Sequence, residues 1–523
     1  MAAGVVVVES RKAVVLQPSN MAQFTSCLPT AKEFSHKGLQ MLYVPHNLDE
    51  TKVLRNLGVA VPSPMSYQYD WPKAQGKYDP FIHQRATSEF LTFHTRAAIL
   101  NAPRTGKTNS CLWTADYLMK QGLVHKVLIV CPLSTLDMVW GAEIFATLWW
   151  RKAVILHGSR ERRLRLLKED VDFYVVNHDG FAIIKDDLPP GVDLIIYDEA
   201  AVLRNPSTIR FKQFNAFVSA NPATRLWLLT GSPTPNEPTD AWALCKLLNA
   251  PDLPRFTLFR EQVMMKIRQW TWAPRPGSEQ TVSRYLQPSI RYTRDECFDL
   301  PDTVYETRRC ELSPHQKKLF LAMVQHLATE VQGEKITAFN EAVKVQKLLQ
   351  ILLGVVYTDT GESKFVDCEP RIRVIREIIE ECNEKVLVFV PFTGALHGIA
   401  TSLSKHFEVA FVNGEISKNK RNEIFRAFRD NPKLKALIAD ARCMQHGLDM
   451  TTATTIIWAG PTNSNETYEQ ASDRIKGPKQ KLKTAVVHIE ATPIERKIFE
   501  RLKNRQRLQG LLLDLLQNQD DIF

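Results

Sequence analysis

Short runs of apolar, often β-branched residues alternate with helical patterns along most of the chain. A first set of runs covers residues 127–130, 173–176, 194–197 and 226–229. A second set covers residues 386–389, 409–412, 436–439, 455–458 and 485–488. Continuous apolar runs of this length, separated by helices, predict parallel strands that are buried on both faces. Two such sets predict two α/β lobes in tandem.

The regions outside these sets have different patterns. Residues 1–75 end in a proline-rich stretch and predict a small N-terminal accessory module with a linker. Residues 251–367 are rich in charge and in helix formers, which predicts a linker with a helical insertion between the lobes. Lobe 1 is then expected at residues 76–250 and lobe 2 at residues 368–523. Within the insertion, prolines around Trp272 favour a loop.

The composition is that of an ordinary globular protein, with 44% hydrophobic and 24% charged residues. Lys and Arg outnumber Asp and Glu by 67 to 57, an excess that is compatible with a polyanionic partner but does not identify one. Nine cysteines occur without any CxxC pair, which argues for a reducing compartment and against a zinc site. No stretch reaches the ~18 apolar residues of a membrane span. We therefore expect a cytoplasmic protein, in a bacterium or a phage-infected cell, without a membrane partner.

A candidate phosphate-binding loop follows the apolar stretch that ends at Leu100. Thr105, Gly106, Lys107 and Thr108 form the end of a GxxxxGK[ST] pattern that lacks its first glycine. Backbone N–H groups at the start of a helix receive an anion. Lys107 is expected to hold the β- and γ-phosphates of ATP, and the Thr108 hydroxyl to bind Mg²⁺.

A pair of carboxylates, Asp198 and Glu199, follows the apolar run 194–197. The carboxyl ends of parallel strands are where α/β folds place ligand chemistry. Asp198 is expected to bind Mg²⁺, and Glu199 to orient or deprotonate the attacking water. The alternative is a pair that only caps the next helix. The spacing after a phosphate loop favours the catalytic interpretation.

Further strings complete an ordered pattern from about residue 78 to the C-terminus. They are Tyr78 to Gln84, Val127 to Trp140, Asp198 to Ala201, Leu229 to Asn236, Ala441 to Thr452, and Gln470 to Arg474. In this order they resemble the motifs of the Snf/Swi-type ATPases of helicase superfamily 2, especially the compact versions of phages and bacteria. The string LTGSPTPN at 229–236 is the most specific of them.

The resemblance implies two RecA-like lobes that hydrolyse ATP in the cleft between them. Arg474 would stabilise charge on the γ-phosphate as an arginine finger. Thr230, Gly231 and Ser232 would couple hydrolysis to lobe movement. The implied nucleotide-binding positions are Gln84, which would read adenine, Thr105, Gly106, Lys107, Thr108, Gly447, Asp449 and Gln470.

The resemblance also implies double-stranded DNA as the partner, with forked or branched DNA left open. Small polar groups suit phosphate contacts, which position nucleic acid without reading its sequence. Binding is therefore expected to be nonspecific and sensitive to salt. The adjacent Trp149 and Trp150 are expected to pack in the core rather than on a base. The candidate phosphate contacts are Ser134, Thr135, Asn177, His178, Thr393 and Gln445.

Three positions depart from the family pattern. Arg104 stands where many relatives carry glycine, Ala201 where histidine is usual, and Gly477 where a second arginine is expected. A translocase or remodeller on duplex DNA is the favoured interpretation, because the residues needed for phosphoryl transfer are retained. The alternatives are a strand-separating or branch-migrating helicase, a nucleotide-gated DNA-binding module with little turnover, and the motor subunit of a restriction or anti-restriction assembly.

Overall fold

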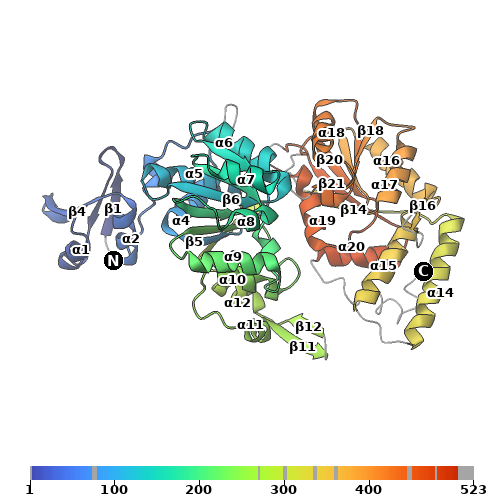
Figure 1. The fold of residues 1–523 in the computed structure, drawn as a ribbon, viewed down its shortest axis with the longest axis horizontal. Helices are drawn as coiled ribbons and strands as arrows, with labels where there is room; N and C mark the ends of the chain where they lie inside the picture. Colours follow the sequence, from blue (N-terminus) through green and yellow to red (C-terminus); the bar gives the residue numbers. More distant parts are fainter. Residues whose placement is uncertain are drawn as a thin grey trace. The chain divides into compact units, whose positions relative to one another are not determined.

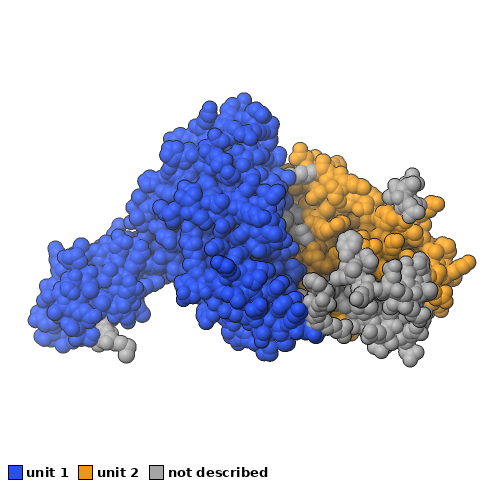
Figure 2. Space-filling view, turned by 60° about the horizontal axis from the view of Figure 1, so that its bottom comes forward, with its two compact units in different colours: residues 1–297 blue, residues 298–523 orange. Residues whose placement is uncertain are grey.

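The computed structural model describes residues 3–73, 79–268, 271–297, 303–333, 338–357, 363–444, 450–477 and 480–504. The chain divides into two compact units, residues 1–297 and residues 298–523 (Figure 2). Each unit carries one large sheet whose described strands all run parallel. The predicted fold, two α/β lobes in tandem, is therefore confirmed.

The large sheet of unit 1 has seven strands, with helices between consecutive strands (Figure 1). Their order is β13 (Ser289–Ile290), β5 (Arg96–Ile99), β10 (Arg225–Leu229), β9 (Val192–Tyr197), β6 (Lys126–Cys131), β8 (Phe173–Asn177) and β7 (Ala153–Leu156). The helices are α4 (Ile82–Phe93), α5 (Lys107–Lys120), α6 (Ala142–Thr147), α7 (Arg160–Leu167), α8 (His178–Ile184), α9 (Ile209–Ala220), α10 (Trp242–Leu247), α11 (Phe256–Val263), α12 (Ser278–Tyr285) and α13 (Arg294–Cys297).

Alternate residues of each central strand enter two different hydrophobic cores. Leu128 and Ile195 belong to one core, whereas Ile129 and Ile196 belong to the other. Because side chains of a strand point to opposite faces in turn, a sheet covered by helices on both sides needs apolar residues at every position. This is the physical reason for the uninterrupted apolar runs in the sequence.

Unit 2 repeats this plan with six parallel strands. Their order is β14 (Thr303–Arg309), β21 (Thr484–Glu490), β20 (Ala453–Trp458), β17 (Lys385–Phe389), β19 (Ala436–Ala439) and β18 (Val409–Val412). The helices are α14 (Pro314–Gly333), α15 (Ala338–Leu352), α16 (Glu369–Glu381), α17 (Thr393–Leu403), α18 (Lys418–Asp430), α19 (Asn465–Ser472) and α20 (Pro493–Lys503). A buried ion pair of 2.8 Å between Arg371 and Glu495 joins α16 to α20. Of the segment 251–367, residues up to 297 belong to unit 1 and the rest to unit 2.

The N-terminal residues of unit 1 form a separate antiparallel sheet with its own small core. Its strands run in the order β1 (Ala3–Val8), β2 (Ala13–Gln17), β4 (Leu39–Pro45) and β3 (Lys32–His36), with α1 (Met21–Cys27) and α2 (Leu48–Asn56) beside them. The segment that follows is held on α5. The Tyr69 hydroxyl donates to Asp116 at 2.9 Å, and the Trp113 indole donates to the Pro72 carbonyl at 2.6 Å.

Two expectations about tryptophans were wrong. Trp149 is 74% exposed, and the half-exposed Trp150 donates its indole N–H to Asp116 at 3.3 Å instead of packing in the core. Trp272 lies in a strand and not in a loop, because β12 (Thr271–Pro274) pairs with β11 (Met264–Arg268) to form a hairpin (Figure 1). The Arg260 guanidinium lies 4.5 Å above the Trp272 ring. In the described ranges no helix has both the length and the apolar character that crossing a membrane requires.

Candidate functional site

The loop between β5 and α5, residues 100–106, adopts the backbone that a phosphate loop needs. Gly106 has a φ of 82°, and a Cβ at this position would run into the side-chain amide of Gln84. Arg104 has a φ of 69°, a left-handed conformation that costs residues with a side chain roughly 1–2 kcal/mol. The left-handed backbone explains why glycine would suit position 104, and it makes Arg104 a strained residue in this loop.

The C-terminal half of the loop is held by the start of α4. Nε2 of His83 lies 2.9 Å from the Thr105 carbonyl oxygen, and the Gln84 amide donates to the same oxygen at 3.1 Å. The other end of the Gln84 amide accepts the Phe81 N–H at 3.1 Å. Gln84 is buried, so in this structure its amide braces the loop. The sequence did not indicate the part of His83.

The N-terminal half of the loop is held by the chain that follows β13. The Ala102 N–H donates to the Tyr292 carbonyl at 2.9 Å, and the Tyr292 N–H donates to Oδ1 of Asn101 at 3.0 Å. Asn101 occupies the place of the missing first glycine. The Asn101 side chain therefore anchors the loop to the chain after β13. The sequence pattern shows only that glycine is missing at this position.

The coupling string also contacts this loop. The Thr230 N–H donates to the Ile99 carbonyl at 3.0 Å, and the Thr230 hydroxyl accepts the Ser232 N–H at 3.2 Å. A Cβ on Gly231 would lie 2.9 Å from Cδ of Pro103. The structure thus brings the predicted coupling residues against the phosphate loop.

Lys107 turns its ammonium back onto the loop. Nζ donates to the carbonyl oxygens of Asn101 at 2.8 Å and of Ala102 at 3.2 Å. Burial lowers the pKa of Lys107, while the charges of Glu199 and Asp198 act in the opposite direction. An ammonium held at the start of α5 among loop N–H groups is suited to phosphate oxygens.

The acidic pair follows β9. Oδ2 of Asp198 accepts the Trp140 indole N–H at 2.9 Å, and Oδ1 accepts the Glu199 N–H at 3.0 Å. Burial, and then the negative charge of Glu199, raise the pKa of Asp198 to about 6. Two half-buried carboxylates are hard oxygen ligands that fit a divalent cation such as Mg²⁺. Among the described residues no group of three or more His, Cys, Asp or Glu side chains outlines a metal site.

His178, the first residue of α8, lies beside the acidic pair. Nε2 of His178 lies 2.8 Å from the Asp198 carbonyl oxygen. The His178 ring stacks on Tyr197 with centroids 5.0 Å apart. His178 and Tyr197 also line a cavity of about 520 Å³ together with Arg210. The His178 ring therefore contacts the acidic pair through the backbone carbonyl of Asp198.

The predicted nucleic-acid contacts of unit 1 cluster at the carboxyl ends of β6 and β8, which pair side by side. Ser134 is exposed, whereas Thr135 is buried and its hydroxyl donates to the Pro132 carbonyl at 3.0 Å. Oδ1 of Asn177 accepts a hydrogen bond of 2.9 Å from the buried Arg163. The side chains of Thr135 and Asn177 are thus engaged inside unit 1.

Three of the candidate residues in unit 2 are described. Nε of Arg474 donates to the Gln470 carbonyl at 2.9 Å, and the Arg474 side chain is buried. Thr393 is the first residue of α17. Gln445, Gly447 and Asp449 lie outside the described residues.

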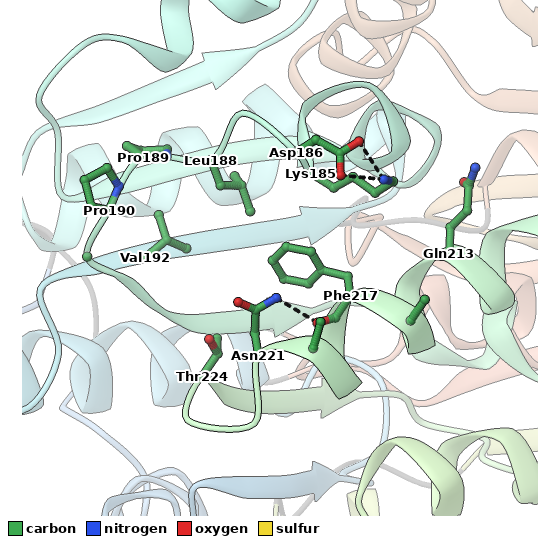
Figure 3. A pocket seen from close by; sticks show the side chains of 13 residues that line it. Lys185, Asp186, Leu188, Pro189, Pro190, Val192, Gln213, Phe217, Asn221 and Thr224 are labelled. Carbon is green, nitrogen blue, oxygen red and sulfur yellow. Dashed lines mark hydrogen bonds and ion pairs between the residues drawn. The ribbon is translucent and has the colours of Figure 1, made fainter.

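A larger hollow, of about 720 Å³, lies elsewhere on unit 1 (Figure 3). It includes Val192, the first residue of β9, and Phe217 and Asn221 at the end of α9. The ion pair Lys185–Asp186 belongs to its lining (Figure 3). Because it adjoins the amino end of β9, it is remote from the strand ends that carry the phosphate loop and the acidic pair. We therefore assign the site by its chemistry and not by the size of the hollow.

Comparison with known proteins agrees with this arrangement. Residues 66–356 match the model of the SNF2-related domain, and residues 370–476 match that of the helicase conserved C-terminal domain. The chain is 23% identical to protein p41 of the Acyrthosiphon pisum secondary endosymbiont phage 1, over 84% of this chain and 99% of p41.

A plant protein and a solved structure are also similar to this chain. The chain is 23% identical to the ATP-dependent DNA helicase DDM1 of Arabidopsis thaliana, over 78% of this chain and 58% of DDM1. A solved SWI2/SNF2 ATPase core of Sulfolobus solfataricus in complex with dsDNA is 22% identical, with a TM-score of 0.41, over 86% of this chain and 95% of that one. The SNF2-related model alone covers more than half of the chain. The chain therefore belongs to the SNF2-related family and carries its helicase-like ATPase domains.

Proposed function

We propose that this chain is an ATP-driven motor that translocates along double-stranded DNA and remodels it or its bound proteins without separating the strands. The proposal rests on one observation. Lys107 is hydrogen-bonded to the phosphate loop, and the charges of Asp198 and Glu199 lie close enough to act on it. ATP and Mg²⁺ would supply a charged phosphoanhydride and its counter-ion. Lys107 and the first N–H groups of α5 would bind the phosphates.

The acidic pair divides two tasks in this proposal. Asp198, whose carboxylate is held by the Trp140 indole, would bind the metal ion together with the Thr108 hydroxyl. Glu199 orients the attacking water and accepts its proton. Arg474 of unit 2 is proposed to stabilise the charge that develops on the γ-phosphate. Gln470, Gly447 and Asp449 are proposed to assist it in nucleotide binding.

The contact between the coupling string and the loop supports a motor over a simple hydrolase. A change at the phosphates would move Pro103, which packs on Gly231. Packed contacts of this kind have few intermediate positions, so small shifts are transmitted and not absorbed. We propose that Thr230, Gly231 and Ser232 pass the nucleotide state to the rest of unit 1.

Duplex DNA is the proposed track. The name of DDM1 describes an ATP-dependent DNA helicase, and its likeness to this chain extends over both lobes. At the ends of β6 and β8, Ser134 is exposed and His178 is half-buried, and polar groups of this kind suit phosphate contacts. Ser134, Thr135, Asn177, His178, Thr393 and Gln445 are proposed to contact the backbone. No described feature favours strand separation, branch migration or passive nucleotide-gated binding over translocation.

ATP turnover on a panel of nucleic acids tests the proposal. The panel holds no nucleic acid, single-stranded DNA, blunt duplex DNA, forked DNA, four-way DNA and duplex RNA. The proposal predicts the strongest stimulation by blunt duplex DNA, with stimulation lost in Lys107→Ala. Preference for single strands or forks would instead indicate a strand-separating enzyme. ATP binding without turnover on any substrate would indicate a nucleotide-gated binding module.

A further inference from the structure

The segment by which the chain leaves unit 1 runs hydrogen-bonded beside the phosphate loop. We call residues 288–294 the exit segment. The N–H groups of Ala98, Leu100 and Ala102 donate in turn to the carbonyls of Pro288, Ile290 and Tyr292, at 3.0, 2.8 and 2.9 Å. Every second residue of the exit segment is thus paired with β5 or the loop that follows it.

Continuation of this pairing brings Arg294 to the loop. Two residues beyond Tyr292, the Arg294 guanidinium donates to the Pro103 carbonyl at 3.4 Å. The Thr293 N–H and hydroxyl donate to one oxygen of Glu296, at 2.6 and 2.7 Å, which defines the turn into α13. The position of Arg294 therefore follows from strand register and a capped turn, and not from a free surface side chain.

Arg294 and Lys107 contact consecutive carbonyls of the phosphate loop, because Arg294 donates to that of Pro103 and Lys107 to those of Asn101 and Ala102. The positive charge of Arg294 contributes to lowering the pKa of Lys107, although burial is the larger cause. Two cations held this close repel each other in a partly buried site, where Coulomb interactions are weakly screened. A bound polyanion would attract both Arg294 and Lys107 and so offset the repulsion between them.

We propose that Arg294 is a second cation for the terminal phosphate of the bound nucleotide, supplied by the exit segment of the same unit. This inference rests on the proposed function, because it presumes that the loop binds ATP. Arg294 presents a planar guanidinium whose fixed fork can bind two oxygens of one phosphate, whereas the Lys107 ammonium acts as a compact point charge. The nucleotide's γ-phosphate would thus be held from both sides of the loop.

Direct binding of nucleotides without nucleic acid tests this assignment. The probes are a non-hydrolysable ATP analogue and ADP, each with Mg²⁺. The variants are Arg294→Gln, Arg294→Lys and Lys107→Ala. Arg291→Gln is the matched control, because Arg291 is an exposed arginine of the same exit segment. Thermal unfolding of each variant checks that the fold is intact.

Arg294→Gln is expected to weaken binding of the ATP analogue about tenfold or more, the size of one charged hydrogen bond. ADP, which lacks the γ-phosphate, should bind within about threefold of the wild type by the same reasoning. Arg294→Lys should restore part of the loss, and Arg291→Gln should change neither affinity. Equal losses for the analogue and for ADP would overturn the inference, since a residue that only braces the loop acts on both. An unchanged affinity would overturn it as well.

Lys107→Ala separates this inference from the proposed function. If Lys107→Ala still binds both nucleotides like the wild type, the proposed function fails. If Lys107→Ala loses binding while Arg294→Gln retains it, the proposed function stands and the role of Arg294 is wrong.

Discussion

The carbonyl oxygen of Asn101 accepts a hydrogen bond of 2.8 Å from the Lys107 ammonium. The side chain of the same Asn101 accepts the Tyr292 N–H, so one residue links Lys107 to the exit segment. A nucleotide must therefore compete with loop carbonyls for the Lys107 ammonium. In the proposed function the Lys107 ammonium already lies at the loop that would bind the phosphates, so only its hydrogen-bond partners would need to change.

The left-handed backbone at position 104 predicts a stability difference between two variants. Arg104→Gly and Arg104→Ala both remove the guanidinium, but only glycine relieves the strain of φ 69°. We expect Arg104→Gly to be about 1 kcal/mol more stable than Arg104→Ala, after allowing for the greater chain entropy of glycine. Urea unfolding of both variants measures the difference. Equal stabilities would show that the left-handed conformation is not kept in solution.

The packing of Gly231 on Pro103 predicts that a single added methyl group disturbs nucleotide binding. In Gly231→Ala the new Cβ would meet Cδ of Pro103 at 2.9 Å, so the phosphate loop must shift. We expect the KM for ATP to rise several-fold and the DNA-stimulated kcat to fall. Gly414→Ala is the control, because a Cβ there would meet no described atom within 4 Å. Wild-type kinetics in Gly231→Ala would remove the argument for coupling through this contact.

The raised pKa of Asp198 predicts how stability depends on pH without nucleotide. The pKa is about 6 in the folded protein and near 3.8 for an ordinary aspartate. The folded protein therefore bears the full penalty of the buried charge above pH 6 and is relieved as the pH falls below 6. Asp198→Asn lacks this dependence, so its advantage over the wild type should shrink by about 1 kcal/mol between pH 8 and pH 5. Parallel stability curves for the two proteins would contradict the raised pKa.

The buried His488 predicts acid sensitivity of unit 2. Its ring stacks on Phe499 with centroids 4.2 Å apart, and Nε2 lies 2.8 Å from the Tyr468 hydroxyl. Burial, and then the charge of Lys503, lower the pKa of His488 to about 3. The neutral ring leaves the folded state fully stable above the ordinary pKa of 6.5. The folded state loses stability as the pH falls below that value, because the unfolded chain then takes up a proton that the buried ring cannot.

The loss should amount to about 1.4 kcal/mol for each pH unit below 6.5. His488→Gln cannot gain a proton, so its unfolding free energy should fall less steeply between pH 6.5 and pH 4.5 than that of the wild type. Denaturant unfolding followed by a probe in unit 2 measures both slopes. Identical slopes would place the acid sensitivity elsewhere.

The sequence predicts those features that depend on neighbours along the chain. Strands such as β6 and β9 can be predicted from the sequence because their apolar residues enter one of two cores in turn. The phosphate-loop role of Gly106 and Lys107 can be predicted because the loop and the helix that follows it are contiguous in the sequence. The features that could not be predicted join distant segments. Trp140 is 58 residues from Asp198, and no periodicity encodes their hydrogen bond.

The errors have the same origin. Nothing near Trp150 indicates that its indole would find Asp116, a buried carboxylate 34 residues away. The hairpin that contains Trp272 depends on cross-strand pairing with Lys266, whereas the nearby prolines suggested a loop. Departures such as Arg104 were visible in the sequence, but their meaning required the backbone angle.

Displacement of a third strand from a blunt-ended DNA duplex is the measurement that tests the central claim most directly. The third strand lies in the major groove, so a motor that moves along the duplex removes it without opening the base pairs. We predict that the wild type displaces it only with ATP and Mg²⁺, that Lys107→Ala does not, and that the two duplex strands stay paired. Separation of the duplex strands, or ATP hydrolysis on duplex DNA without any displacement, would contradict translocation on double-stranded DNA.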